Sequence, residues 1–161
     1  METYQWFTLA RIIHVLAVVI WIGGVAMVTV IIIPAIKKMK RKEEQLQTFE
    51  QIEGRFAKIA KITTLLTAFS GFYMIYITDT WYRYADFQFW WLHAMTLIWF
   101  IFTLILFVFE PFVLHRLFHK YMEKNPAKTF QIMHMAHWFL LIISLITLIG
   151  AVAGSHGWFF F

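Results

Sequence analysis

The sequence predicts an all-α integral membrane protein, a four-helix bundle that forms a single domain over residues 1–161. Of its 161 residues, 61% are hydrophobic and only 14% are charged. A soluble domain of this size has too little polar surface to cover so many apolar side chains. Formal charges are also absent from four stretches that match or approach the ~20 residues needed to cross ~30 Å of hydrocarbon, namely 12–36, 62–78, 87–109 and 129–161.

The first helix is expected over about 7–33, with Pro34 marking its end because proline breaks the helical hydrogen-bond pattern. Its apolar run is too long for a cleavable signal peptide and lacks a small-residue cleavage site, so we expect it to remain as a helix. Steps of three and four residues place one set of side chains on a single face: Ala10, His14, Ala17, Trp21, Gly24 and Val28.

A polar connector at 35–55 precedes the second helix, which is expected over about 56–78. The connector is rich in good helix formers, so it is expected to extend as a cytoplasmic or interfacial helix whose basic cluster favours anionic lipid; a solvated connector is the simpler interpretation. In the second helix, small and hydroxyl residues share one face, which allows close helix approach in a bilayer or leaves room for a flat macrocycle. They are Ala60, Thr64, Thr67, Gly71 and Met74.

The third and fourth helices are expected over about 88–120 and 127–153. Before the third, the loop 79–87 and its flank carry an interfacial aromatic belt. Glu110-Pro111 is expected near the inner interface, where the proline kinks the helix and the carboxylate pairs with a lysine or arginine. The inward stripe expected on the third helix is His93, Thr96, Phe100, Thr103 and Phe107.

The distribution of basic residues predicts the orientation. Eight Lys and Arg residues lie between the first and second spans and four between the third and fourth, whereas only Arg11 and Arg83 lie on the opposite side. By the positive-inside rule both basic loops are cytoplasmic, so both termini face outward. We therefore expect a multi-pass protein of the bacterial inner membrane, with a lipid bilayer rather than nucleic acid as the partner of its positive charge.

The composition also excludes several chemistries. The chain has no cysteine, which excludes disulfides, thiolate-ligated haem, Cys-bound iron–sulfur clusters and Cys-based zinc or copper sites. No GxSxG, P-loop or HExxH sequence occurs, so nothing supports a hydrolase or a phosphoryl-transfer enzyme. No catalytic residue is assigned.

Two histidines, His14 and His93, are the principal candidate ligands. Each lies roughly 8–10 Å inside an apolar helix that begins on the outer side. A histidine in hydrocarbon is costly, and two at one depth can hold a haem iron between them. Arg11 and Arg83 lie near enough to meet haem propionates, and Trp21 shares the His14 face. The alternative is that each histidine hydrogen-bonds across the bundle.

A second group of histidines lies at the inner side. His134 and His137 are three residues apart and share a helix face, which suits a second haem or a metal ion. Met133 and Met135 flank His134, and sulfur with imidazole suits copper. His115 and His119 end the third helix, where partial solvation among lysines is the alternative. The weaker candidates for metal binding are His115 and, in the outer tail, His156.

Three segments resemble the HemJ/CopD-like membrane proteins: RIIHVLAVVIWIGGVAM, EGRFAKIAKITTLLTAFSGFYMIY and WWLHAM. The resemblance implies a four-helix bundle that binds haem b, with His14 as a ligand and His93 within the same site. Two residues after His93, however, Met95 stands where HemJ-type protoporphyrinogen oxidases have lysine, which argues against that activity. The CopD branch is associated with copper uptake.

These observations predict a b-type cytochrome that holds one or two haem b groups and exchanges electrons with quinone or a periplasmic redox partner. A HemJ-type protoporphyrinogen IX oxidase and a CopD-like copper protein are the alternatives, and a purely structural subunit is the fourth. Whether the chain is an enzyme, and whether it forms a homo-oligomer, stay open.

Overall fold

A computed structural model describes residues 2–114, 120–121 and 125–158 of the chain. These residues contain no strand, and they form four helical rods that are long and apolar enough to cross a membrane. The prediction of an all-helical, four-span protein is confirmed. The elements are α1 (Glu2–Met27), η1 (Val28–Ile32), α2 (Ile33–Lys37), α3 (Lys42–Ile77), η2 (Trp81–Ala85), η3 (Phe87–Phe89), α4 (Trp90–Leu104), η4 (Ile105–Leu114) and α6 (Pro126–Ser155).

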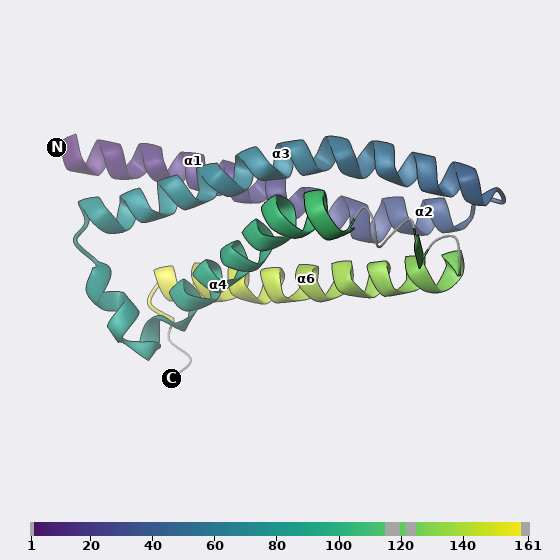
Figure 1. Cartoon of the computed structure of the whole chain (residues 1–161). Coiled ribbons are helices and arrows are strands. Elements are labelled where there is room, and N and C mark those ends of the chain that lie inside the picture. Colours follow the sequence, from purple (N-terminus) through teal and green to yellow (C-terminus); the bar gives the residue numbers. More distant parts are fainter. Residues whose placement is uncertain (1, 115–119, 122–124, 159–161) are drawn as a thin grey trace.

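The rods associate as two antiparallel pairs (Figure 1). The rod α1–η1–α2 lies along α3, whereas α4 packs mainly against α6 and runs obliquely across the bundle. Many large apolar side chains point away from the bundle: Val19 is 61% exposed, Phe69 71% and Ile149 64%. Because nothing in water would stabilise such a surface, these side chains are suited to contact lipid, as expected for a multi-pass membrane protein.

The inward face predicted for the first helix is confirmed. Ala10, Ala17, Trp21 and Val28 are buried, and His14 and Gly24 are half-buried. The ring of Phe56, on α3, occupies the place that a Cβ of Gly24 would need, so the two helices approach closely there.

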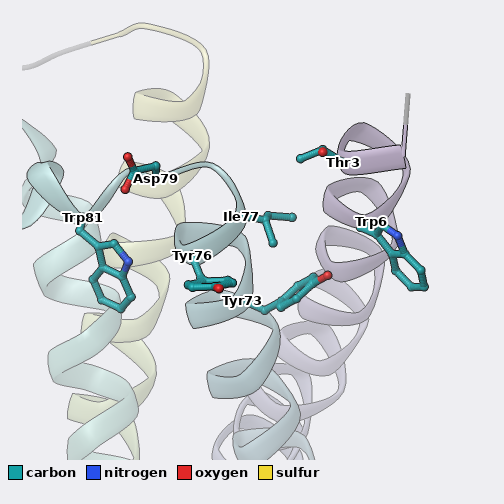
Figure 2. Close-up of a pocket in the computed structure, with 7 residues that line it drawn as sticks. All are labelled: Thr3, Trp6, Tyr73, Tyr76, Ile77, Asp79 and Trp81. Atoms are coloured by element: carbon teal, nitrogen blue, oxygen red, sulfur yellow. The ribbon is translucent and has the colours of Figure 1, made fainter.

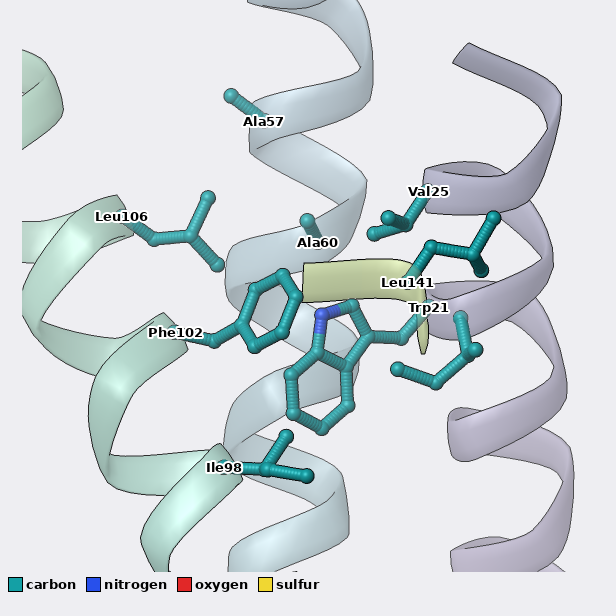
Figure 3. Close-up of a cluster of buried hydrophobic side chains, with 9 residues drawn as sticks. Trp21, Val25, Ala57, Ala60, Ile98, Phe102, Leu106 and Leu141 are labelled. Atoms are coloured by element: carbon teal, nitrogen blue, oxygen red, sulfur yellow. The ribbon is translucent and has the colours of Figure 1, made fainter. Parts of the chain in front are cut away.

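The core of the bundle surrounds Trp21 (Figure 3). Its indole meets the ring of Phe102 edge to face, with ring centroids 4.9 Å apart. From α3, the predicted small-residue stripe contributes Ala60 and Thr64, which are 1% and 0% exposed. The stripe therefore serves close helix packing, one of its two expected roles. A second cluster joins α2, α3 and α6 at the other end of the bundle: Val28, Ile33, Ile36, Phe49 and Phe130.

The stripe predicted for the third helix is only partly correct, because His93, Thr96, Thr103 and Phe107 are half-buried but Phe100 is not. Phe100, at its centre, is 51% exposed, and the buried residues of this helix are Trp91, Ile98, Phe102 and Leu106. The helix turns a different face toward the bundle than the predicted stripe because α4 packs mainly against α6. The indole of Trp91 lies over Gly154, where a Cβ would stand 2.5 Å from the ring. A glycine on α6 thus makes room for an aromatic ring on α4.

The first helix does not end at Pro34, where its end was predicted. The segment η1 is a π-helix in which the N–H of Ile33 donates to the carbonyl of Val28, five residues back. In the same pattern the N–H of residue 34 would donate to the carbonyl of Thr29, but residue 34 is a proline and has no N–H. Residues 33–37 nevertheless continue as α2. The carbonyl of Thr29, a fully buried residue, is left to a partner outside its own helix.

The third rod carries a second π-helical segment, η4, which includes the expected Glu110-Pro111 step. The expected partner of Glu110 is also present: Lys61 Nζ, from α3, donates to Glu110 Oε2 over 2.7 Å. Each side chain of this ion pair is 30% exposed. The pair links α3 to η4 and neutralises both charges next to an apolar bundle.

Candidate functional site

The imidazole of His14 lies between α1 and α3. Its Nδ1 is 2.9 Å from the carbonyl oxygen of Thr67 and 3.1 Å from Ser70 Oγ. The Ser70 hydroxyl hydrogen points to the carbonyl of Leu66, so both groups facing Nδ1 are acceptors. Nδ1 therefore carries the proton, and Nε2 is left with a lone pair. This is the arrangement that metal-ligating histidines commonly have, with one ring nitrogen held by a carbonyl.

A glycine provides the room for this ring. A Cβ on Gly71 would lie 3.2 Å from His14 Cε1 and 3.4 Å from Nδ1, which is tighter than most Cβ contacts. Gly71 was predicted to share the small stripe of α3. The structure shows that a side chain at this position would push the imidazole away from Thr67.

His93 has different neighbours. Its ring stacks on Phe87 at a centroid distance of 5.8 Å and meets Tyr84 edge to face at 5.5 Å. Tyr84 is held in turn by a hydrogen bond of 2.8 Å between its hydroxyl and that of Thr96. The Nε2 atom of His93 is buried and has no hydrogen-bond partner among the residues that the structure describes. A buried polar atom without a partner costs roughly 1–3 kcal/mol, so this nitrogen is suited to an additional ligand.

The two histidines lie at related depths in the bundle. The rods α1 and α4 run in the same general direction (Figure 1), and Trp21 contacts Phe102. His14 precedes the first of these residues by seven positions and His93 precedes the second by nine, a difference of about 3 Å along a helix. Their polar contacts differ, however: those of His14 come from α3, and the ring contacts of His93 come from the 79–89 connection.

The remaining outer candidates lie around these two. Arg11 is exposed, one turn before His14. Arg83 is exposed as well, and its guanidinium lies 5.1 Å from the centre of the Phe89 ring. Trp21 belongs to the packed core, where its Nε1 is buried without a hydrogen-bond partner. His156 is exposed, with Nδ1 2.8 Å from the carbonyl of Val152.

His134 has protein partners on both ring nitrogens. Lys37 Nζ lies 2.9 Å from Nδ1, and the carbonyl of Thr29 lies 2.9 Å from Nε2. An ammonium group can only donate, so Nδ1 accepts and Nε2 carries the proton that it donates to Thr29. Trp138 Nε1 is 3.1 Å from the same Nε2, but it would donate to that nitrogen only in the other tautomer. His134 thus supplies the donor that Pro34 lacks.

His137 is half-buried, and its Nδ1 lies 3.0 Å from the carbonyl of Met133, four residues earlier in α6. Its Nδ1 is the proton donor, which leaves Nε2 with a lone pair. Met135, the other sulfur of the predicted copper set, is 58% exposed and points away from the bundle. His115 and His119 lie outside the described residues.

Among residues 2–114, 120–121 and 125–158, no three His, Asp or Glu side chains gather as a metal site would require. No family model, curated protein or solved structure matches the chain.

Sequence reasoning missed the residues that hold the histidines. Thr67, Ser70, Tyr84 and Phe87 contact His14 or His93, yet only the hydroxyl stripe and the aromatic belt hinted at them. Thr29 was missed entirely. A signal for it existed, because a proline inside an apolar helix leaves a carbonyl that needs a donor from another helix.

Proposed function

We propose that this protein is an integral-membrane b-type haem protein of the HemJ/CopD-like kind, which carries electrons in or across the bilayer. The observation that supports the proposal most is the buried Nε2 of His93, which has no protein partner. A neutral imidazole nitrogen in an apolar setting is a good ligand for haem iron. It lies in a helix long and apolar enough to cross a membrane.

His14 supports the same proposal through its tautomer. Because Thr67 and Ser70 both accept from Nδ1, the lone pair of Nε2 is available to a ligand. His14 and His93 are thus the two residues that would hold a haem, either together in one site or with only one of them as a ligand. His137 has the same tautomer and is the candidate for a second haem.

The other residues of this region have supporting roles in the proposal. A bound haem b supplies reversible one-electron chemistry. The rings of Tyr84 and Phe87 pack against the His93 ring and orient it. The exposed guanidinium groups of Arg11 and Arg83 favour the carboxylates of propionate side chains. On the positive-inside rule this end faces the periplasm of a bacterial inner membrane, where quinone or a periplasmic redox protein would exchange electrons.

Neither alternative has a comparable observation in its favour. A copper site at His134 would compete with Lys37, whose ammonium group lies 2.9 Å from Nδ1. A HemJ-type oxidase would place a lysine where the chain has Met95.

The test is the visible spectrum of the purified protein, oxidised and reduced with dithionite, with haem measured as the pyridine haemochrome. We expect a reduced α band of the b type, lost in His93→Gly and restored by added imidazole, which replaces the missing side chain without refolding the protein. His156→Ala is the matched control, since that exposed histidine should leave the band unchanged. A colourless wild-type protein from haem-supplied cells would overturn the proposal.

A further inference from the structure

Two adjoining hollows lie at the end of the bundle where α1 begins and α3 ends. The larger has a volume of about 480 Å³ and the smaller about 400 Å³, and Trp6 lines both. Four aromatic side chains line the larger one, and Figure 2 shows Tyr76 between Tyr73 and Trp81. Neither His14 nor His93 lines either hollow, so this region is separate from the proposed haem ligands.

The charges that line these hollows are all negative. Asp79 lines the larger and Glu2 the smaller, and no basic side chain within the described part of the chain lines either. The carboxyl end of α3 lies here too, and the carbonyl end of a helix carries a partial negative charge that favours cations. Glu2 lies in the first turn of α1, where it offsets the positive end of that helix. The charge of Glu2 is thus already balanced, and Asp79 with the carboxyl end of α3 supplies the negative charge that favours a cation at the larger hollow.

The aromatic rings favour the same ligand. Tyr76 is 71% exposed and Trp6 55% exposed, so parts of their rings are free to meet a ligand. The face of an aromatic ring attracts ammonium groups. The attraction is strongest for alkyl-substituted ammonium groups, because they hold less water. Trp81 is fixed by stacking on Phe72 at 6.4 Å between centroids, while 47% of its surface stays exposed.

Asp79 is held in an unusual backbone conformation. Its φ of 50° lies in the left-handed region, which costs a non-glycine residue about 1 kcal/mol or more. Its amide donates to the carbonyl of Tyr76 over 3.3 Å, which closes the turn after α3. A glycine would adopt this turn without strain, so the aspartate is present at the cost of that strain.

We propose that the larger hollow binds the ammonium group of an amphiphilic cation, between Asp79 and the rings of Tyr76 and Trp81. The alkyl part would lie along the exposed apolar surface of α1, where Leu9, 46% exposed, lines the adjoining hollow. The ammonium group would come from a lipid headgroup or from a free alkylammonium compound. This proposal does not depend on haem binding.

The test is native mass spectrometry of the full chain in a maltoside detergent. The probes are phosphatidylethanolamine, phosphatidylcholine and phosphatidylglycerol with identical acyl chains, and dodecyltrimethylammonium. All three lipids carry the phosphate, and only phosphatidylglycerol has a net negative charge, which the basic connector at 35–55 also favours. The change that a variant of this hollow makes to the lipid preference therefore reports the ammonium group. We expect the affinity of each of the two ammonium lipids to exceed that of phosphatidylglycerol by a factor of at least about three. Binding of dodecyltrimethylammonium without that lipid preference would identify the free cation as the source.

Two variants link the preference to this hollow. Asp79→Asn removes the charge while keeping a residue type that tolerates positive φ, and Tyr76→Leu removes a ring at an exposed position. Each should abolish most of the preference, whereas Asp86→Asn, outside both hollows, should not change it. The proposal is overturned if the wild-type protein binds no probe in preference to phosphatidylglycerol, or if both variants retain the full preference.

Discussion

Replacement of His134 by leucine tests whether this histidine supplies the hydrogen bond that Pro34 cannot give to the carbonyl of Thr29. The side chain of His134 donates from Nε2 to the carbonyl of Thr29 over 2.9 Å, and Thr29 is 0% exposed. The leucine leaves this carbonyl buried without a donor. A lost partner of this kind costs roughly 1–3 kcal/mol in soluble proteins, and hydrogen bonds between membrane helices average about 0.6 kcal/mol. We therefore expect a loss of about 1 kcal/mol in the free energy of unfolding.

The decisive comparison is the same substitution in a Pro34→Ala background. Alanine restores the missing N–H, so the helix can supply a donor to Thr29 without His134. The cost of His134→Leu should then fall by most of its value, which a double-mutant cycle measures as a coupling of about 1 kcal/mol. Unfolding in dodecyl sulfate, followed by circular dichroism, provides the free energies.

Lys37 requires a control of its own, because its Nζ also contacts His134. Lys37 is exposed, so Lys37→Met should cost only a few tenths of a kcal/mol. The explanation fails if His134→Leu costs the same with proline and with alanine at position 34, because the histidine would then be stabilising something other than the orphaned carbonyl.

Four further substitutions test two contacts between α3 and its neighbours. Gly54→Ala should raise the unfolding free energy by about 0.5–1 kcal/mol, since nothing lies within 4 Å of the new Cβ, whereas Gly71→Ala should lose that gain because its Cβ meets His14 at 3.2 Å. Equal midpoints of detergent unfolding for the two variants would contradict this contact. Lys61→Met should destabilise the protein by about 2 kcal/mol because it leaves Glu110 without its 2.7 Å partner, and adding Glu110→Leu should recover most of the loss. A double variant as unstable as the sum of the two single variants, measured by the same unfolding assay, would show that the ion pair contributes little.

The four spans could be predicted because the cost of charge in hydrocarbon leaves a long pattern in the sequence. The face that each helix turns inward is harder to predict. On the first helix, His14 and the small residues marked the face, since polar and small side chains avoid lipid. On the third helix, Phe100 and Phe102 are equally apolar, and lipid is as favourable to them as the protein interior. Hydropathy therefore could not choose between them, and the packing against α6 decided the rotation.

The candidate site could be predicted only in part, for a related reason. The cost of an imidazole in a bilayer identified His14, His93, His134 and His137 as residues that need partners. Which atom supplies the partner depends on helix register. Pro34 indicates that an earlier carbonyl of its helix needs a donor from another helix, but the sequence does not show that His134 is that donor. Nor does it show that the carbonyl of Thr67 accepts from His14 and leaves a lone pair on its other ring nitrogen.

The length of α3 divides the bundle into two parts that are stabilised by different forces. Its 36 residues extend about 54 Å, well beyond the ~30 Å of hydrocarbon. We expect the excess to lie at its amino end, where acidic residues flank Phe49 in the sequence and the ring of Phe49 packs on Phe130 at 5.9 Å. Outside lipid, burying these rings removes them from water, so their contribution carries a heat-capacity change and weakens on cooling. Packing inside lipid does not remove side chains from water, so we expect no such heat-capacity change there. Cooling should therefore weaken the packing around the amino end of α3 before it weakens the packing of the membrane-spanning part.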